Sequence, residues 1–236
     1  MTEHTVKAFD EELQRLKTMI AQMGGIAEEQ LAQAMDALSR RDTALADRVI
    51  ADDHRIDELE DAVEDRAVVV IAKRQPMASD LREILVAIRV ASDLERIGDL
   101  AKNLAKRTLA MPETQPRKVI AGLARMSELA QEQLHRILDA YARSDSDLAL
   151  EVWRADEEID SLYNSVFREL LTYMMEDPRT IGPCTHLLFG AKNLERIGDH
   201  TTNIAENIYF QIHGRPIPEE RQKKDTTSVT GIGARP

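Results

Sequence analysis

Apolar residues recur at steps of three and four along most of the chain, a period that predicts long amphipathic helices. The first helix is expected over residues 6–40, where the apolar stripe begins with Phe9, Leu13, Leu16, Ile20 and Met23. Gly24 and Gly25 interrupt this stripe and predict a kink, because each glycine costs about 1 kcal/mol relative to alanine within a helix. The pattern then resumes, so the residues on both sides of the glycines belong to one helix.

Two further helices follow in the first half of the chain. The second is expected to start at Asp42, an acceptable N-cap, and to continue through residue 74. Pro76 ends it, because the residue before a proline avoids the helical region of the backbone. A capping box at Asp80 starts the third helix, which Pro112 closes.

The second half of the chain repeats the first. Many of residues 31–59 are identical to the residue 103 positions further on, and the third helix shows identities at a shift of 100. The longest identity is the segment LERIGD, which occupies residues 94–99 and again residues 194–199. Tandem copies of a three-helix unit without a strand pattern predict an all-α fold of two pseudo-symmetric bundles with long antiparallel helices.

Prolines and the end of the helical pattern mark the boundaries of these units. We expect the first three-helix repeat over residues 5–111 and the second over residues 115–214. Residues 217–236 are charged and then rich in Thr, Ser and Gly, with no apolar stripe. This last segment is therefore expected to be a mostly disordered tail.

Composition narrows the function without identifying it. The formal net charge of −11 argues against nucleic acid as a partner, because nucleic-acid binders usually present a basic face. The single cysteine, Cys184, cannot form an internal disulfide, which is typical of a reducing cytoplasm. No apolar run approaches the roughly 18 residues that span a bilayer, so we expect membrane contact only through a partner. Motifs for nucleotide binding or nucleophilic catalysis are also missing, and nothing indicates an enzyme.

Acidic residues four positions apart recur in both units and form the candidate site. Residues with this spacing lie on one face of a helix, where like charges repel by roughly 0.2–0.5 kcal/mol unless a cation offsets them. The pairs on the second and third helices are Asp53 with Asp57, Glu95 with Asp99, Asp156 with Asp160, and Glu195 with Asp199. Folding each hairpin places its two pairs at matching depth on neighbouring antiparallel helices, which predicts a four-carboxylate site in each unit.

Two kinds of occupant are compatible with such a site. Carboxylate oxygens favour hard cations, so we expect divalent or trivalent metal ions, with Mg, Mn, Fe and Zn as candidates. Alternatively, basic side chains such as Arg55, Arg96 or Arg196 neutralise the acids, which are then only a solvated face. Gly98 and Gly198 recur within the motif and indicate either close helix packing or room for a ligand.

Several motifs together resemble the PhoU family of phosphate-uptake regulators. They are the two LERIGD copies, RQP at residues 74–76 followed by DLR at 80–82, and YMMED at 173–177. The resemblance covers roughly residues 5–213, and the motifs occur in the family's order. It implies two PhoU-like repeats, and it identifies the four acid pairs as the family's motifs for multinuclear metal clusters.

The resemblance also implies a function. PhoU proteins are cytoplasmic, are not enzymes, and act as negative regulators of phosphate uptake and of the phosphate-starvation response. Their proposed role is that of an adaptor, so the expected partners are the ATP-binding subunit of the phosphate ABC transporter and a sensor histidine kinase. Family members form dimers or higher oligomers, and we expect a homodimer.

Two other functions are compatible with the residues alone. A carboxylate-bridged metal storage protein or oxidase also uses a helical bundle with clustered acids, but such bundles carry a pair of Glu-x-x-His motifs. Here only Glu132 and His135 have this spacing, and no second copy accompanies them. The remaining alternative is a purely structural bundle whose acids are solvated.

Overall fold

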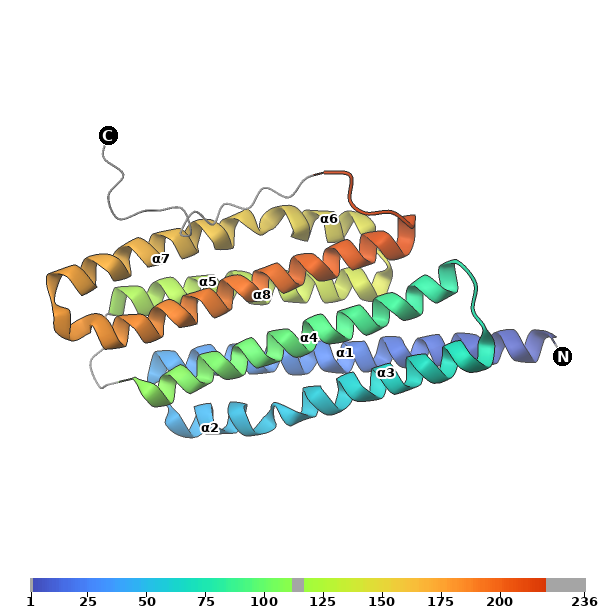
Figure 1. The fold of residues 1–236 in the computed structure, drawn as a ribbon, viewed down its shortest axis with the longest axis horizontal. Coiled ribbons are helices and arrows are strands. Elements are labelled where there is room, and N and C mark those ends of the chain that lie inside the picture. Colours follow the sequence, from blue (N-terminus) through green and yellow to red (C-terminus); the bar gives the residue numbers. More distant parts are fainter. Residues whose placement is uncertain (1, 112–116, 220–236) are drawn as a thin grey trace.

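The structure is a computed structural model that describes residues 2–111 and 117–219, with the backbone alone for residues 2–8 and 117. Within those ranges it contains two bundles of helices side by side and no strand (Figure 1). The first bundle consists of α1 (Thr2–Arg40), α2 (Thr43–Asp52), α3 (His54–Arg74) and α4 (Ser79–Ala110). The second consists of α5 (Arg117–Arg143), α6 (Ser146–Ala155), α7 (Glu157–Glu176), the 3-10 turn η1 (Pro178–Thr180) and α8 (Ile181–His213). The predicted all-α fold of two three-helix units is confirmed.

The second helix of each unit is bent, and it is not the single helix that its pattern predicts. It divides at Asp53 in the first unit and at Asp156 in the second, and the bend after α2 is visible in Figure 1. Both aspartates keep helical backbone angles. Their carbonyl groups, however, accept hydrogen bonds from N–H groups only three residues further on, those of Ile56 and Ile159. The apolar period continues through the bend, so periodicity alone contains no sign of it.

Gly24 does not kink α1, which continues without interruption from Thr2 to Arg40. It is instead buried against α5, where a Cβ atom on Gly24 would lie 2.6 Å from Leu138 Cδ2. The neighbouring Gly25 has open space at the same position. Gly24 therefore permits close approach of the two units, and the predicted change of helix direction is wrong.

Alanine substitutions should separate the roles of these two glycines. Gly25→Ala should stabilise the protein by about 1 kcal/mol, because it raises helix propensity and meets no neighbour. Gly24→Ala gains the same propensity but forces Leu138 to move, so it should be less stable than Gly25→Ala by about 1 kcal/mol. Urea unfolding measures the difference, and equal stabilities would mean that Leu138 repacks without strain.

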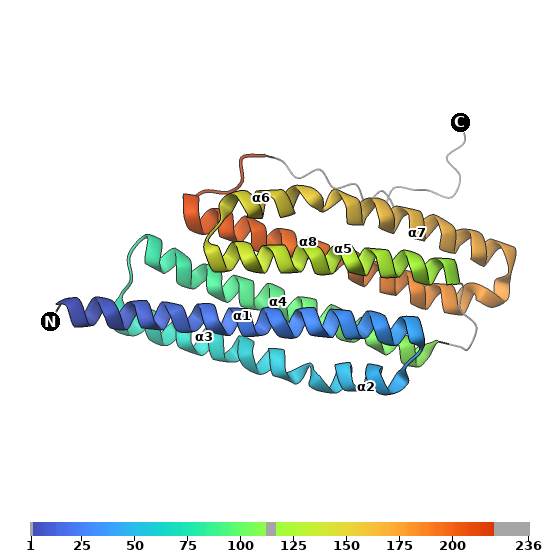
Figure 2. The same ribbon diagram turned by 180° about the vertical axis from the view of Figure 1, so that it is seen from behind.

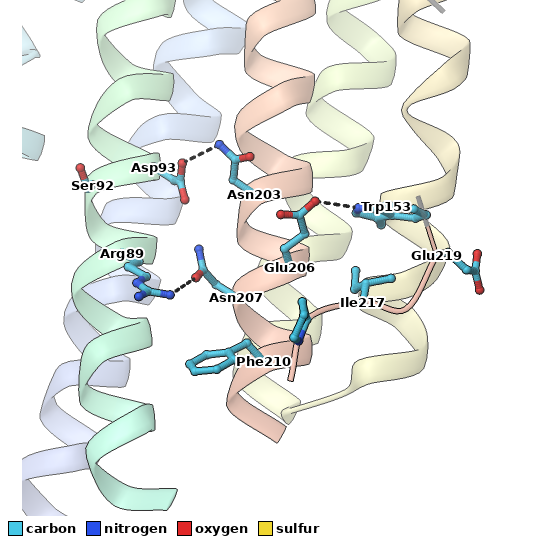
Figure 3. Close-up of a pocket in the computed structure, with 11 residues that line it drawn as sticks. Arg89, Ser92, Asp93, Trp153, Asn203, Glu206, Asn207, Phe210, Ile217 and Glu219 are labelled. Atoms are coloured by element: carbon cyan, nitrogen blue, oxygen red, sulfur yellow. Dashed lines mark hydrogen bonds between the residues drawn. The ribbon is translucent and has the colours of Figure 1, made fainter. Parts of the chain in front are cut away.

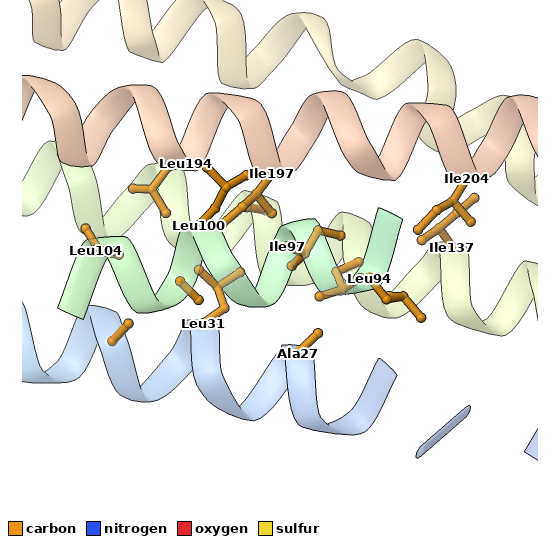
Figure 4. Packing of buried hydrophobic residues seen from close by; sticks show 14 of the residues in the cluster. Ala27, Leu31, Leu94, Ile97, Leu100, Leu104, Ile137, Leu194, Ile197 and Ile204 are labelled. Atoms are coloured by element: carbon orange, nitrogen blue, oxygen red, sulfur yellow. The ribbon is translucent and has the colours of Figure 1, made fainter. Parts of the chain in front are cut away.

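The two units pack through α4 against α8 and through α1 against α5, and both pairs are antiparallel (Figure 1, Figure 2). Arg89 near the start of α4 donates a hydrogen bond to Asn207 near the end of α8. Leu104, later in α4, lies against Gly190, earlier in α8. The middles of the two helices therefore face each other, and the LERIGD copies meet there. Their apolar residues form the centre of the core between the units and are Leu94, Ile97, Leu194 and Ile197 (Figure 4).

The segment after α8 lies across the second unit. Ile217 packs against the core, and Glu219 forms an ion pair with Arg154 of α6 at 2.6 Å. Residues 217–219 thus differ from the predicted tail, whose remainder, residues 220–236, lies outside the described residues. Across the described ranges, none of the helices is long and apolar enough to cross a membrane.

Candidate metal centres

The first unit brings its four predicted ligands together where the second helix lies against the third. The bend between α2 and α3 supplies Asp53, the next turn supplies Asp57, and α4 supplies Glu95 and Asp99. Asp53 is buried, Glu95 and Asp99 are half-buried, and Asp57 lies at the exposed edge. Partial burial, followed by the charges of Asp53 and Asp99, raises the pKa of Asp57 above its ordinary value. These four residues are called the first cluster.

Lys102, three residues beyond Asp99 on α4, places its ammonium group inside the first cluster. It donates hydrogen bonds to Asp53 and, at 2.8 Å, to Asp99 Oδ1. Burial works to lower the pKa of Lys102, but its hydrogen bonds to the two aspartates outweigh this effect and raise the pKa above its ordinary value. A basic side chain therefore offsets part of the negative charge, and it is a lysine that the sequence pattern did not single out.

Arg96 contacts the first cluster only from its outer side. Its Nη1 donates a hydrogen bond to Asp99 Oδ2 at 3.4 Å, and its Nε lies 3.3 Å from Glu95 Oε2 without hydrogen-bond geometry. Because the Arg96 side chain is 57% exposed, solvent screens both contacts. Burial raises the pKa of Glu95, and the lowering effect of Arg96 does not reverse this. The arginine within LERIGD thus neutralises the acids incompletely.

The second unit repeats this arrangement with deeper burial. Its cluster, called the second cluster, consists of Asp156 at the bend, Asp160 on α7, and Glu195 and Asp199 on α8. The exposed fractions of Asp156, Asp160 and Glu195 are only 5%, 3% and 3%. Burial raises the pKa of Glu195; a hydrogen bond from Lys192 lowers it, and the charges of Asp199 and Asp160 raise it further.

In the second cluster the lysine is Lys192, which lies three residues before Glu195, whereas Lys102 lies three residues after Asp99. Its ammonium group donates a hydrogen bond to Glu195 Oε1 at 2.8 Å and lies 4.9 Å from the ring centroid of Tyr163. At a shift of 100, the position equivalent to Lys102 is Thr202, and the position equivalent to Lys192 is Ser92. The pattern of recurring residues does not include either lysine, because neither is repeated in the other unit. A lysine three residues from an acid of the motif is the signal that could have identified them.

The recurring glycines allow buried polar side chains to approach α4 and α8 closely. A Cβ atom on Gly98 would lie 2.9 Å from Gln30 Oε1, and one on Gly198 would lie 2.8 Å from Asp156 Oδ1. Gln30 and its repeat equivalent Gln133 are both buried, and sequence reasoning did not select them. Gln30 makes no hydrogen bond through either amide atom. Of the two interpretations of the glycines, the geometry supports close packing.

Among the residues that the structure describes, three buried carboxylate oxygens lack a hydrogen-bond partner: Asp53 Oδ1, Glu95 Oε2 and Glu195 Oε2. Because a buried acceptor without a donor is unfavourable, a cation bound by these oxygens would be stabilising. The all-oxygen donor set fits a hard metal ion. In the described part of the chain, however, no three His, Cys, Asp or Glu side chains already converge as ligands of one ion. Metal binding therefore stays a prediction, and in the first cluster it requires Lys102 to withdraw.

Glu195→Gln should stabilise the metal-free protein at neutral pH. Burial raises the pKa of Glu195, so the folded state disfavours its charged form. The parent protein therefore loses stability as the pH rises from the ordinary pKa of 4.5 through the higher pKa of Glu195 in the folded state. Below pH 4.5 this loss is absent. Urea unfolding with a chelator should show the variant more stable than the parent at about pH 7 and similar to it near pH 4. The exposed Glu132→Gln is the control, and a less stable Glu195→Gln variant at pH 7 would contradict the prediction.

The Glu-x-x-His spacing in α5 does not belong to either cluster. His135 Nδ1 pairs with Glu28 Oε1 of α1 at 2.9 Å, across the contact between the units. Glu132 is exposed to solvent. The partner of His135 is thus none of the eight predicted ligands, and nothing in this geometry favours a metal storage protein or oxidase.

Fold and clusters together define a class of protein: a duplicated three-helix bundle in which each copy gathers four carboxylates between its second and third helices. The PhoU domain matches residues 20–108 and 123–208, one match in each unit. The chain therefore belongs to the PhoU family, and the resemblance that its motifs indicated is confirmed.

Similar proteins support this assignment over nearly the full length. A relative from Rhizobium meliloti (strain 1021) is 55% identical over 97% of both chains, and one from Caulobacter vibrioides (strain NA1000 / CB15N) is 52% identical over 97% of this chain and 100% of its own. Both are named phosphate-specific transport system accessory protein PhoU homolog. The crystal structure of PhoU from Pseudomonas aeruginosa is 38% identical and has a TM-score of 0.85, covering 88% of this chain and 100% of that one.

Proposed function

We propose that this protein is a cytoplasmic, non-catalytic negative regulator of phosphate uptake and of the phosphate-starvation response. The observation that carries the proposal is the similarity of this chain, at 55% and 52% identity over 97% of its length, to accessory proteins of phosphate-specific transport systems. A structurally similar protein from Streptococcus pneumoniae, with 29% identity and a TM-score of 0.84, is named a phosphate transport system regulatory protein. Regulation of the same transport system is the function most consistent with these relationships.

The proposal includes an adaptor role between the ATP-binding subunit of the phosphate ABC transporter and a sensor histidine kinase. We place the two contacts at two exposed methionines, because burying an apolar side chain against a partner would stabilise the complex. Met77, in the turn between α3 and α4, is 79% exposed, and Met175, at the end of α7, is 84% exposed. These turns lie at opposite ends of the molecule (Figure 1), so two partners could be bound at once. A homodimer would present each surface twice.

Metal ions complete the proposal. Asp53, Asp57, Glu95 and Asp99 would hold metal in the first unit, and Asp156, Asp160, Glu195 and Asp199 in the second. Bound metal would add to the positive charge of Lys102 and Lys192, and it would link the second helix of each unit to the third. The buried oxygens of Asp53, Glu95 and Glu195 that lack a hydrogen-bond donor support this part of the proposal.

Gene deletion tests the regulatory role. Loss of the protein should raise expression of a phosphate-starvation reporter in phosphate-rich medium, and the parent gene supplied on a plasmid should restore repression. The result follows from a negative regulator whose absence frees the kinase to act. Unchanged reporter expression in the deletion strain would contradict the proposal.

Affinity capture tests the adaptor role directly. In high phosphate, the tagged protein should recover both the transporter ATP-binding subunit and the sensor kinase. Met77→Glu and Met175→Glu should each lose one of these partners and keep the other, because each adds a charge to a different exposed apolar site. Recovery of neither partner by the parent, or identical behaviour of the two variants, would contradict an adaptor with two separate surfaces.

A further inference from the structure

A cavity of about 580 Å³ lies where the two units meet, and its lining includes none of the eight carboxylates of the two clusters. The first unit contributes α4, the second contributes α6 and α8, and residues after α8 cross the opening (Figure 3). Its walls include Arg89, Asp93, Trp153, Glu206, Phe210 and Ile217. The volume is in the range of small-molecule sites, which is roughly 300–1,000 Å³.

Two carboxylates in this cavity have no lysine or arginine partner among the described residues. Asp93 Oδ1 accepts a hydrogen bond from Asn203 at 3.3 Å and lies 2.9 Å from His200 Nδ1. Glu206 Oε1 accepts a hydrogen bond from the Trp153 indole at 3.1 Å. These carboxylates come from different walls, because Asp93 is on α4 and Glu206 is on α8 (Figure 3). The cavity therefore presents negative charge from two sides.

The other charged groups of the walls do not cancel this charge. Glu219 at the opening pairs with Arg154 of α6 at 2.6 Å. Arg89 donates its hydrogen bond to Asn207, and its guanidinium lies 5.7 Å from the ring centroid of Phe210. Arg89 thus interacts with an amide and a ring and with neither of the two carboxylates. A phosphate or nucleotide would meet more negative than positive charge here, which disfavours an anionic ligand.

We propose that this cavity binds a small organic cation with aliphatic primary ammonium groups, of the diamine or polyamine class. Asp93 and Glu206 would accept charge-assisted hydrogen bonds from separate ammonium groups. The ring of Trp153 favours a nearby cation, whereas the Phe210 ring already has the Arg89 guanidinium as its cation, and Ile217 adds an apolar contact for the methylene chain. The ligand would contact both units at once, so its binding strengthens their association. This site is independent of the proposed metal ions.

Tryptophan fluorescence offers a local measurement, because Trp153 is the single tryptophan of the chain and lines the cavity. The full-length protein should be titrated with putrescine in the presence of a chelator at constant ionic strength. A saturable change in fluorescence is the expected result. Glu206→Gln keeps an oxygen acceptor for the indole but removes the charge, so it should weaken binding by about tenfold. Asp93→Asn provides a second, independent variant with the same expected loss.

The control variant is Glu132→Gln, an exposed change of equal charge on α5, which should bind putrescine as the parent does. Lysine serves as a second ligand, because a free amino acid shares the ammonium group but adds a carboxylate. If the preferred ligand is an amino acid, Arg89→Ala should weaken binding of lysine more than binding of putrescine, because only lysine has a carboxylate that Arg89 could pair with. Either preference supports an aliphatic ammonium site. The proposal is overturned if neither ligand gives a saturable change, if both carboxylate variants bind like the parent, or if Mg²⁺ gives the same response.

Discussion

Lys102→Met is expected to destabilise the metal-free protein by about 3 kcal/mol. The Lys102 ammonium group bridges Asp53 and Asp99, and the Asp53 side chain is only 4% exposed. Removing one member of a buried ion pair leaves the other charge uncompensated, which typically costs about 3–5 kcal/mol. We expect the low end of that range, because Lys102 is 24% exposed and Asp99 is 32% exposed, so water screens part of the loss.

Divalent metal ions should reverse this destabilisation. With the ammonium group removed, Mn²⁺ or Mg²⁺ no longer competes with Lys102 for the carboxylates of the first cluster, and the ion supplies the missing positive charge. Unfolding by urea, with chelator and then with each ion, should show a larger gain for Lys102→Met than for the parent. Lys106→Met, an exposed change on the same helix, is the control and should alter stability little. A Lys102→Met variant that no cation stabilises would contradict a metal site in the first cluster.

Removing the charges that the two LERIGD copies supply should abolish metal binding. The combined variant Glu95→Gln, Asp99→Asn, Glu195→Gln and Asp199→Asn preserves side-chain shape but removes the anionic oxygens that a hard cation requires. Elemental analysis of protein purified without chelator should find metal in the parent and almost none in the variant. At a metal concentration about 100-fold above its dissociation constant, the parent should gain about 2.7 kcal/mol of unfolding free energy for each occupied site, and the variant should gain nothing.

Pairwise variants separate the two clusters. Changing only Glu95 and Asp99, or only Glu195 and Asp199, should remove the metal of one unit and leave that of the other. Glu128→Gln with Glu132→Gln removes charge from the exposed face of α5 and is the matched control. Equal metal content in this control and in the combined variant would contradict the metal proposal.

Most helix boundaries followed from local signals, which explains why most of the fold could be predicted. The capping box predicted at Asp80 is an exception, because α4 begins at Ser79 and its N-cap, Ala78, makes no side-chain hydrogen bond. Asp42 caps α2 as expected, since its side chain accepts a hydrogen bond from the Leu45 N–H at 2.9 Å. Its repeat equivalent Asp145 caps α6 in the same way. The bend at Asp53 was not predicted, because a shift from four-residue to three-residue hydrogen bonds leaves the apolar stripe in place.

The positions of the two clusters were predicted, but the lysine side chains that pair with their carboxylates were not. Spacing of four residues identified the acids on one face of each helix, and hairpin geometry placed the two pairs together. Lys102 was missed because it has no repeat copy, and although its spacing from Asp99 is a local signal, 49 residues separate it from Asp53. The cavity between α4 and α8 was missed for a similar reason, since its walls come from three helices in two units.

By itself, the sequence determined the helical class, the duplication, the acid pairs and the family, because periodicity, capping and repeated motifs are local properties. Only the tertiary structure decided that the LERIGD copies face each other at the centre of the molecule. It also placed one lysine in each cluster, and among the described residues it left two carboxylates of the cavity between the units without a lysine or arginine partner. Antiparallel packing sets these contacts by bringing residues of distant helices to the same depth, and no pattern along a single helix specifies which helix lies beside it.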